Sequence, residues 1–399
     1  MALAEGRFKV SKEAWLCAAG LLALTALAVS ADRLFRVPGG KLPAILISVM
    51  RNRSLMASSE GDNYYEAILK KQSTPQWKFS LAHPFELFGA AKNQANSQRL
   101  YVHTHDFREW KMGPNLTWDV SGVTTDSTGG IDPGHPLVKP GNTRRIALLG
   151  DSLTSGYGVP PETAFGPKLE EWLNLNKSDG TGPRYQVVNF SYPSYLLPQI
   201  LDIGVEDVPP YKPDVYLVEL SERLVFKEWD TQLVDIVRDG IDPNYDYLRS
   251  IFRQAGVSRS ESEITTRTKL APYRIALIRG ALETLNAHIA SQGATMILLL
   301  FPSLEPGDLS ARRVHDVREV YEGMNVPIID LMDTFDGYSN KRPLLAAPND
   351  PSHLDVHLNG RAYSITLKTF GQKLEQDPNA WAALSGSDSA ILPAPGTSR

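Results

Sequence analysis

The chain has 399 residues, enough for one large α/β domain plus appendages, and its hydrophobic content of 42% allows a sizeable core. Its formal net charge of -4 and the lack of a long basic run exclude an electrostatic case for nucleic-acid binding. Beyond the single cysteine, Cys17, the chain has no thiol that could form a disulfide, act as a nucleophile or bind a metal as thiolate.

The N-terminal residues have the composition of a membrane or export segment. Arg7, Lys9 and Lys12 precede an uncharged, mostly apolar run over residues 14–31. A basic stretch followed by an apolar one predicts export with the N-terminus left in the cytoplasm. We expect residues 1–31 to form an uncleaved transmembrane helix. A signal cleaved after Ala31 and a buried helix of a soluble protein are the alternatives.

Residues 32–142 predict an N-terminal extension and linker rather than a regular domain. Pro38-Gly39-Gly40 indicates a linker, and residues 129–141 are rich in turn-forming residues. His103 and His105 would share one face of an extended strand, which is one way to build a metal site. We prefer the interpretation that these are surface or hydrogen-bonded histidines.

From residue 143 onward, apolar runs of strand length alternate with segments of helical period. This alternation predicts a parallel sheet with helices on both faces, which is a three-layer α/β/α sandwich. We expect this domain to cover residues 143–376, with a polar insertion at about 228–270 and a flexible C-terminal tail over 377–399. The expected strands are 145–149, 185–189, 215–220, 294–301 and 326–331, and the expected helices are 165–174, 272–291, 311–321 and 360–374.

The first of these strands ends abruptly in Gly150-Asp151-Ser152. A serine between the carboxyl end of a strand and a helix lies where open α/β sheets bind ligands, and nearby backbone N–H groups can stabilise an oxyanion. A serine nucleophile also needs a base. The segment 349–359 contains two histidines and ends in Asn359, which we expect to cap the last helix. The alternative is that Ser152 only caps its own helix.

Gly150-Asp151-Ser152-Leu153 resembles block I of the GDSL, or SGNH, hydrolases. The resemblance extends over about residues 145–370, apart from the insertion. The segment 104–108 also resembles a piece that precedes this domain in many membrane-anchored bacterial members. The resemblance implies the flavodoxin-like fold of that family, with a mostly parallel central sheet.

The resemblance also implies roles for individual residues. Ser152 matches the nucleophile, whose own N–H would be one oxyanion donor. Residues 188–194 match block II, with Ser194 where the family often has a glycine that donates its backbone N–H. Residues 213–223 match block III, with Arg223 where an asparagine donor is expected. Arg223 would then donate to the oxyanion, or would instead pair with Glu219 or Glu222.

The resemblance leaves two candidates for the general base. Asp355 and His357 best match the residues that follow the family's histidine, while Asp350 and His353 have its usual Asp-x-x-His spacing. We prefer His357 with Asp355 and keep His353 with Asp350 as the alternate pair. Metal binding by this cluster is a third, less favoured interpretation.

The resemblance therefore implies a serine esterase that hydrolyses an O-acyl or O-acetyl ester of a glycan or lipid through an acyl-serine intermediate. No metal and no organic cofactor is required. Two alternatives stay open: an O-acyltransferase acting on envelope polysaccharide, and a degenerate, glycan-binding protein without activity. We expect a single-pass protein of the cell membrane with the hydrolase domain on the periplasmic or extracellular side. The partners expected are the ester substrate and the membrane, with no nucleic acid.

Overall fold

The computed structural model describes residues 90–91, 98–99, 101–103, 106–108, 110–113, 115, 117–118, 123–125, 130, 134–175, 182–193, 195–226, 229–304, 317–346 and 357–386. The chain divides into two compact units, Met1–Gly61 and Asp62–Arg399, and every described residue belongs to the second. The apolar segment 14–31 lies outside the described residues. Within the ranges above, no helix is both long enough and apolar enough to cross a membrane.

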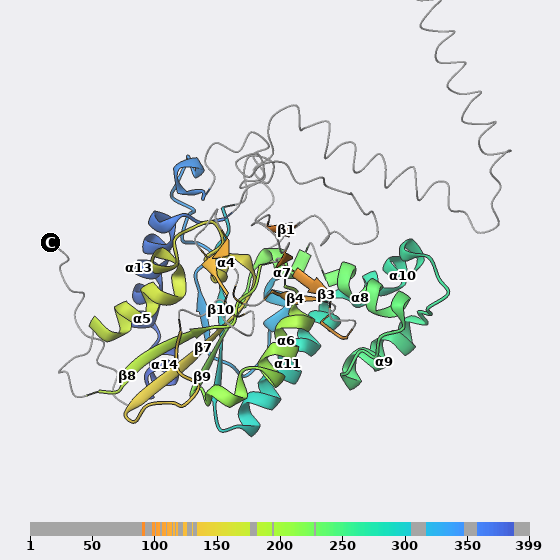
Figure 1. The fold of residues 1–399 in the computed structure, drawn as a ribbon, viewed down its shortest axis with the longest axis horizontal. Helices are drawn as coiled ribbons and strands as arrows, with labels where there is room; N and C mark the ends of the chain where they lie inside the picture. Colours follow the sequence, from red (N-terminus) through yellow and green to blue (C-terminus); the bar gives the residue numbers. More distant parts are fainter. Residues whose placement is uncertain are drawn as a thin grey trace, which may run out of the picture. The chain divides into compact units, whose positions relative to one another are not determined.

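Five parallel strands form the sheet at the centre of the second unit (Figure 1). They are β7 (Thr143–Leu149), β8 (Arg184–Asn189), β9 (Val215–Leu220), β10 (Thr295–Leu300) and β11 (Ile328–Asp330). Their spatial order is β11-β10-β9-β7-β8, which is the flavodoxin-like order. The order reverses between β7 and β9, so the carboxyl ends of these two strands border the crevice where such sheets bind ligands.

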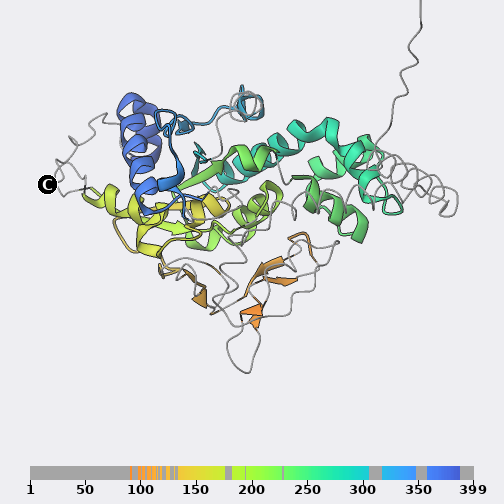
Figure 2. The same cartoon turned by 90° about the horizontal axis from the view of Figure 1, so that it is seen from above.

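The middle parts of the strands are mostly apolar because both faces of the sheet are covered. Successive residues of β7 point to opposite faces, so Ile146 and Leu148 join one buried cluster while Ala147 and Leu149 join the other. The cluster around Ile146 includes side chains from α5 (Phe165–Leu175), α13 (Gly360–Gln376) and α14 (Pro378–Ser385). The other includes side chains from α6 (Leu197–Glu206) and α11 (Arg274–Ser291). The predicted three-layer arrangement is therefore present (Figures 1 and 2).

Shorter elements fill the connections and the insertion. The insertion contains α8 (Trp229–Asp239), α9 (Asp246–Ala255) and α10 (Glu263–Leu270). The site-bearing loops contain α4 (Ser152–Ser155) and α7 (Glu222–Phe226). Single 3-10 turns are η2 (Pro161–Thr163), η3 (Pro209–Tyr211), η4 (Ala271–Tyr273) and η6 (Arg342–Leu344). Before the sheet, three antiparallel pairs join β1 (Ala90–Ala91) to β2 (Gln98–Arg99), β3 (Tyr101–His103) to β4 (Trp110–Met112), and β5 (Thr117–Trp118) to β6 (Val123–Thr124).

The described strands lie within about two residues of the predicted bounds. β7 begins at Thr143 rather than at residue 145, because Thr143 still pairs with the first residue of β8. The long helix α11 begins two residues later than expected, since Pro272 lies in the 3-10 turn η4. Of the helix expected over 311–321, the structure describes residues 317–321, which are helical.

The segment predicted as a flexible tail, 377–399, begins with a further helix, α14. Its apolar residues join the buried cluster that contains α5 and α13. At its C-terminal end the guanidinium of Arg144 donates to the carbonyl oxygens of Ala383, at 2.7 Å, and of Leu384, at 2.6 Å. The expectation of a tail from residue 377 placed the end of the folded region too early, although the N-cap Asp377, followed by Pro378, and the C-terminal Gly386 were available local signals of a helix.

The segment around Phe107 is docked on the core of the second unit. Phe107 is 2% exposed and meets the ring of Tyr245 edge-on at 5.3 Å. Arg108 contacts Asp202 at 2.5 Å and Asp207 at 2.6 Å, both from the region of α6. Burial alone would lower the pKa of Arg108, but hydrogen bonds and charges from these two carboxylates outweigh it and raise that pKa. Phe107 and Arg108 are therefore fastened to the insertion and to the region of α6, respectively.

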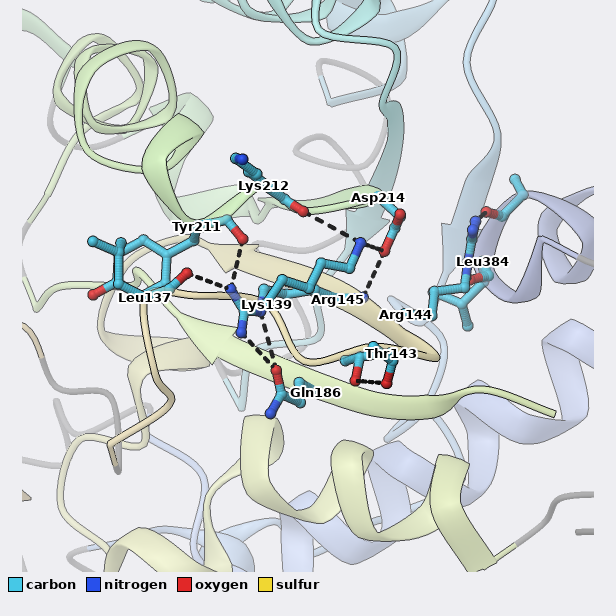
Figure 3. A network of polar contacts seen from close by, with 12 residues as sticks. Leu137, Lys139, Thr143, Arg144, Arg145, Gln186, Tyr211, Lys212, Asp214 and Leu384 are labelled. Carbon is cyan, nitrogen blue, oxygen red and sulfur yellow. Dashed lines mark hydrogen bonds and ion pairs between the residues drawn. The ribbon is translucent and has the colours of Figure 1, made fainter. Parts of the chain in front are cut away.

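At the amino end of the sheet, the fully buried side chain of Arg145 organises a second network (Figure 3). Its guanidinium makes five hydrogen bonds of 2.6 to 3.1 Å, to the carbonyl oxygens of Pro136, Leu137 and Tyr211 and twice to the side-chain oxygen of Gln186. A guanidinium stays charged at any physiological pH, so burying it demands that its five donors be satisfied. The network joins the chain before β7 to β8 and η3, at the opposite end of β7 from Ser152.

Candidate active site

The turn after β7 presents Ser152 at the carboxyl end of the sheet. Asp151 is the N-cap residue of α4, and its side chain accepts a 2.7 Å hydrogen bond from the N–H of Leu153. Only Gly150 and Asp151 separate the end of β7 from the helix, and this cap makes Ser152 its first residue. Gly156, with a φ of 84°, ends the helix in the left-handed conformation that glycine adopts most easily. Local sequence therefore accounts for where the helix at Ser152 begins and ends.

Ser152 and His357 meet across 205 positions of sequence. The hydroxyl oxygen of Ser152 lies 2.9 Å from Nε2 of His357, within hydrogen-bond distance. The two residues are only 6% and 4% exposed. Shielding from water strengthens a hydrogen bond of this kind electrostatically. The ring of Tyr157 lies against the imidazole with its centroid 4.6 Å away. A hydroxyl and an imidazole in this arrangement can exchange a proton.

His357 is held by the backbone on both sides of it. Its carbonyl oxygen accepts a 2.8 Å hydrogen bond from the N–H of Ala346, and Leu358 forms an isolated antiparallel bridge with Leu345. Asn359 then caps α13 by accepting from the N–H of Ala362, as the sequence predicted. The histidine therefore lies on a short extended piece between a bridge and a helix start.

A buried carboxyl group lies beneath the serine turn. Glu219 is the second-last residue of β9 and is 0% exposed. Its Oε2 accepts hydrogen bonds from the N–H of Asp151, at 3.0 Å, and from the hydroxyl of Thr154, at 2.6 Å. Burial raises the pKa of Glu219, and the hydrogen bonds from Thr154 and Asp151 oppose that shift. From the sequence, Glu219 was considered only as a possible partner of Arg223, although a lone acid within an otherwise uncharged, mostly apolar strand was the available signal.

The loop after β8 borders the same turn. The backbone N–H of Tyr192 donates to the carbonyl oxygen of Gly150 at 3.1 Å, and Ser191 lies with its hydroxyl 3.0 Å from that of Thr154. Asn189 accepts from the N–H of Ser191 at 3.0 Å. The predicted block I and block II segments are therefore neighbours in space, as expected for the ends of adjacent parallel strands.

Several predicted site residues lie outside the described part of the chain. These are Ser194, Asp350, His353 and Asp355. Arg223 belongs to α7, which follows β9 directly, but its side chain is also outside the description. Of the two histidines considered for metal binding, His103 lies in β3 and His105 is not described. Among the described residues, no group of three or more His, Cys, Asp or Glu side chains could hold a metal ion.

No protein-family model and no curated protein matches the chain. Solved structures do align with it. TesA aligns over 58% of this chain and 99% of its own, with 15% identity and a TM-score of 0.38. A mutant of the acetylxylan esterase Axe2 from Geobacillus stearothermophilus aligns over 60% of this chain and 96% of its own, with 14% identity and a TM-score of 0.38. The psychrotrophic esterase EstA from Pseudoalteromonas sp. aligns over 58% of this chain and 97% of its own, with 16% identity and a TM-score of 0.36. Similarity at this level leaves the function to be argued from the chain's own residues.

Proposed function

We propose that this chain is a carboxylic ester hydrolase of the SGNH/GDSL type, with Ser152 as nucleophile and His357 as general base. The observation that carries the proposal is the 2.9 Å distance between the Ser152 hydroxyl and Nε2 of His357. It is supported by the place of the pair, at the carboxyl ends of the strands and next to the reversal of strand order. The Gly-Asp-Ser-Leu motif over residues 150–153 is the reason for proposing this family.

The proposed reaction has two steps. His357 takes the proton of Ser152 while the seryl oxygen bonds to the acyl carbon of the ester. The tetrahedral intermediate then expels the alcohol, which receives that proton from His357, and leaves an acyl-serine. Water attacks this ester with His357 again as base, and the carboxylic acid and free Ser152 are released. The cycle consumes one water and needs no redox partner.

Two further functions are assigned from the sequence. Asp355, two residues before His357, would orient the imidazole and stabilise its protonated form. The developing oxyanion would be held by the backbone N–H groups of Ser152 and Ser194 and by the side chain of Arg223. An arginine in place of a neutral amide would add positive charge where negative charge develops, which favours the transition state when the donor is correctly aimed.

The proposal is tested with a fluorophosphonate probe and with hydrolysis of short-chain p-nitrophenyl esters. The wild-type protein should form a single covalent adduct, located on Ser152, and Ser152→Ala should lose both labelling and turnover, with kcat down by about 10³-fold or more. Ser155→Ala is the matched control, because that serine lies in the same short helix and its hydroxyl bonds only to the carbonyl of Ser152 in the contacts described. A wild-type protein that forms no adduct would favour the binding-module alternative.

The choice of base is tested by four single substitutions in the wild-type background. His357→Ala should abolish turnover to the same degree as Ser152→Ala, and His353→Ala should retain most of it. Asp355→Ala should likewise lose turnover, and Asp350→Ala should retain most of it. Loss of activity in His353→Ala together with activity in His357→Ala would transfer the role to His353 and Asp350.

For the substrate, we propose an O-acyl or O-acetyl ester on a glycan or lipid, and for residues 1–31 a membrane anchor with the hydrolase domain on the periplasmic or extracellular side. Both assignments rest on the family resemblance and on the basic-then-apolar N-terminal pattern. Release of acetate from acetylated polysaccharide, with and without a glycan acceptor, separates hydrolysis from acyl transfer. Protease accessibility in spheroplasts tests the location.

A further inference from the structure

Glu219 is a buried acid that the proposed reaction does not use. It lies in β9 with Leu217 and Val218 before it and Leu220 after it, and its side chain is fully shielded from solvent. Burying a carboxyl group is costly unless hydrogen bonds compensate for the lost water. The two hydrogen bonds that its Oε2 accepts both come from the turn that carries Ser152.

These two hydrogen bonds hold the turn on either side of the serine. The N–H of Asp151 belongs to the residue immediately before Ser152, and the hydroxyl of Thr154 belongs to the residue two positions after it. Both converge on the same atom, Oε2 of Glu219. One oxygen from β9 therefore contacts both the N-cap residue and the third residue of the short, fully buried helix α4.

The backbone at Gly150 lies so close to this carboxyl group that only a glycine fits there. A Cβ added to Gly150 would lie 2.2 Å from Oε2 of Glu219 and 2.2 Å from the hydroxyl oxygen of Thr154. Any larger residue at position 150 would push the carboxyl group or the turn away. The glycine of the motif and the acid of the next strand are thus complementary in shape.

We propose that Glu219 is a positioning residue, which holds Ser152 in hydrogen-bond distance of His357 by accepting from Asp151 N–H and the Thr154 hydroxyl. This inference rests on the proposed function for its kinetic consequences. Glu219 touches neither Ser152 nor His357 in the described contacts, so it acts through the turn. Burial raises its pKa, yet a neutral carboxyl group keeps a carbonyl oxygen that can accept both hydrogen bonds. An acceptor rather than a negative charge is what the turn requires.

The test compares Glu219→Gln, which keeps an acceptor oxygen, with Glu219→Met, which removes it at similar size. We expect kcat of Glu219→Gln to stay within about fivefold of wild type. We expect Glu219→Met to lose about 100-fold in kcat and in fluorophosphonate labelling rate, with KM changed less than threefold, because substrate contacts are untouched while the nucleophile is misplaced.

Leu217→Ala is the control for a purely structural effect. Leu217 is also fully buried in β9, two residues before Glu219 and so on the same face of the strand, where it packs in the cluster with α5 and α13. We expect it to lower the free energy of unfolding at least as much as Glu219→Met while keeping kcat near wild type. Thr154→Val serves where Glu219→Met is poorly folded, since it removes one of the two hydrogen bonds without a change in size. It should lower kcat by about tenfold, and its effect should not add to that of Glu219→Met.

A turnover-independent readout separates this inference from the proposed function. In protein labelled with ¹⁵N-histidine, the ring resonances of His357 report its contact with Ser152, and they are assigned by comparison with His357→Gln. We expect Glu219→Met to shift these resonances and Glu219→Gln to leave them unchanged. Wild-type protein that neither labels nor turns over would refute the proposed function and leave this readout to decide on Glu219. The inference is overturned if Glu219→Met keeps kcat and the His357 resonances, if Leu217→Ala loses as much kcat, or if Glu219→Gln is as impaired as Glu219→Met.

Discussion

The hydroxyl of Tyr363 donates a 2.7 Å hydrogen bond to the carbonyl oxygen of Leu153, across 210 positions of sequence. Tyr363 lies in the first turns of α13, just after His357, and Leu153 follows Ser152 in α4. This bond therefore ties the element after the proposed base to the element that carries the proposed nucleophile. Together with the Glu219 contacts, it holds the serine turn from two sides.

Tyr363→Phe removes this bond without changing the packed ring. We expect the free energy of unfolding to fall by about 1–2 kcal/mol, because a buried carbonyl oxygen loses its donor. The kcat for ester hydrolysis should fall more than KM rises, since α4 gains freedom relative to His357. Urea denaturation and steady-state kinetics measure the two effects. Tyr338→Phe, at a position 38% exposed, should change neither, and an unaltered Tyr363→Phe would show that α4 is held without this bond.

Gly150→Ala places a methyl group against Glu219 and Thr154. Because real side chains do not approach to the 2.2 Å that the structure implies, the turn has to shift. We expect a loss of about 2–4 kcal/mol in the free energy of unfolding, together with loss of fluorophosphonate labelling. Gly141→Ala is the matched control, because a Cβ there meets nothing within 4 Å. Retained labelling in Gly150→Ala would contradict the close fit between the glycine and the acid.

Arg145→Met tests the network at the amino end of the sheet (Figure 3). The substitution keeps an apolar stem but leaves the carbonyl oxygens of residues 136, 137 and 211 and the buried side-chain oxygen of Gln186 without their donor. We expect a loss of about 3 kcal/mol or more in the free energy of unfolding, measured by urea denaturation. Arg249→Met, which removes exposed ion pairs to Asp242 and Asp246, should cost less than about 1 kcal/mol. Equal losses in the two variants would count against the importance of the buried network.

Asp235 gives the stability of the protein a specific pH dependence. Burial raises its pKa to about 6, above the ordinary value of 3.8, although Arg238 lies 2.6 Å away and opposes the shift. The folded state therefore holds this proton more tightly than the unfolded state, and the contribution of Asp235 to stability falls as pH rises from about 4 to about 6.

Asp235→Asn removes that proton equilibrium. We expect the stability of Asp235→Asn relative to wild type to increase by about 1–3 kcal/mol between pH 4 and pH 7. Urea denaturation at a series of pH values measures the difference. Asp242→Asn, at an exposed carboxylate, controls for surface charge. A relative stability that stays constant over this range would show that the ion pair with Arg238 cancels the effect of burial.

The sequence by itself determined the elements whose signals are local. The apolar run ending in Gly150-Asp151-Ser152 indicated a strand, a turn and a helix, and Asn359 indicated the start of α13. Both were found, because strand burial and helix capping depend on neighbouring residues. The alternation of strands and helices likewise predicted parallel strands in three layers, which the structure contains.

The tertiary structure alone decided how distant pieces meet. The hydrogen bonds from Arg144 of β7 to the end of α14 and those that Glu219 of β9 accepts beneath Ser152 leave no periodic signal in the sequence. The separation of Ser152 and His357 is also of this kind, since the sequence could name two histidines but could not measure their distance to the serine. Propensity and capping act over a few residues, whereas these contacts form only after the strands have been ordered in the sheet.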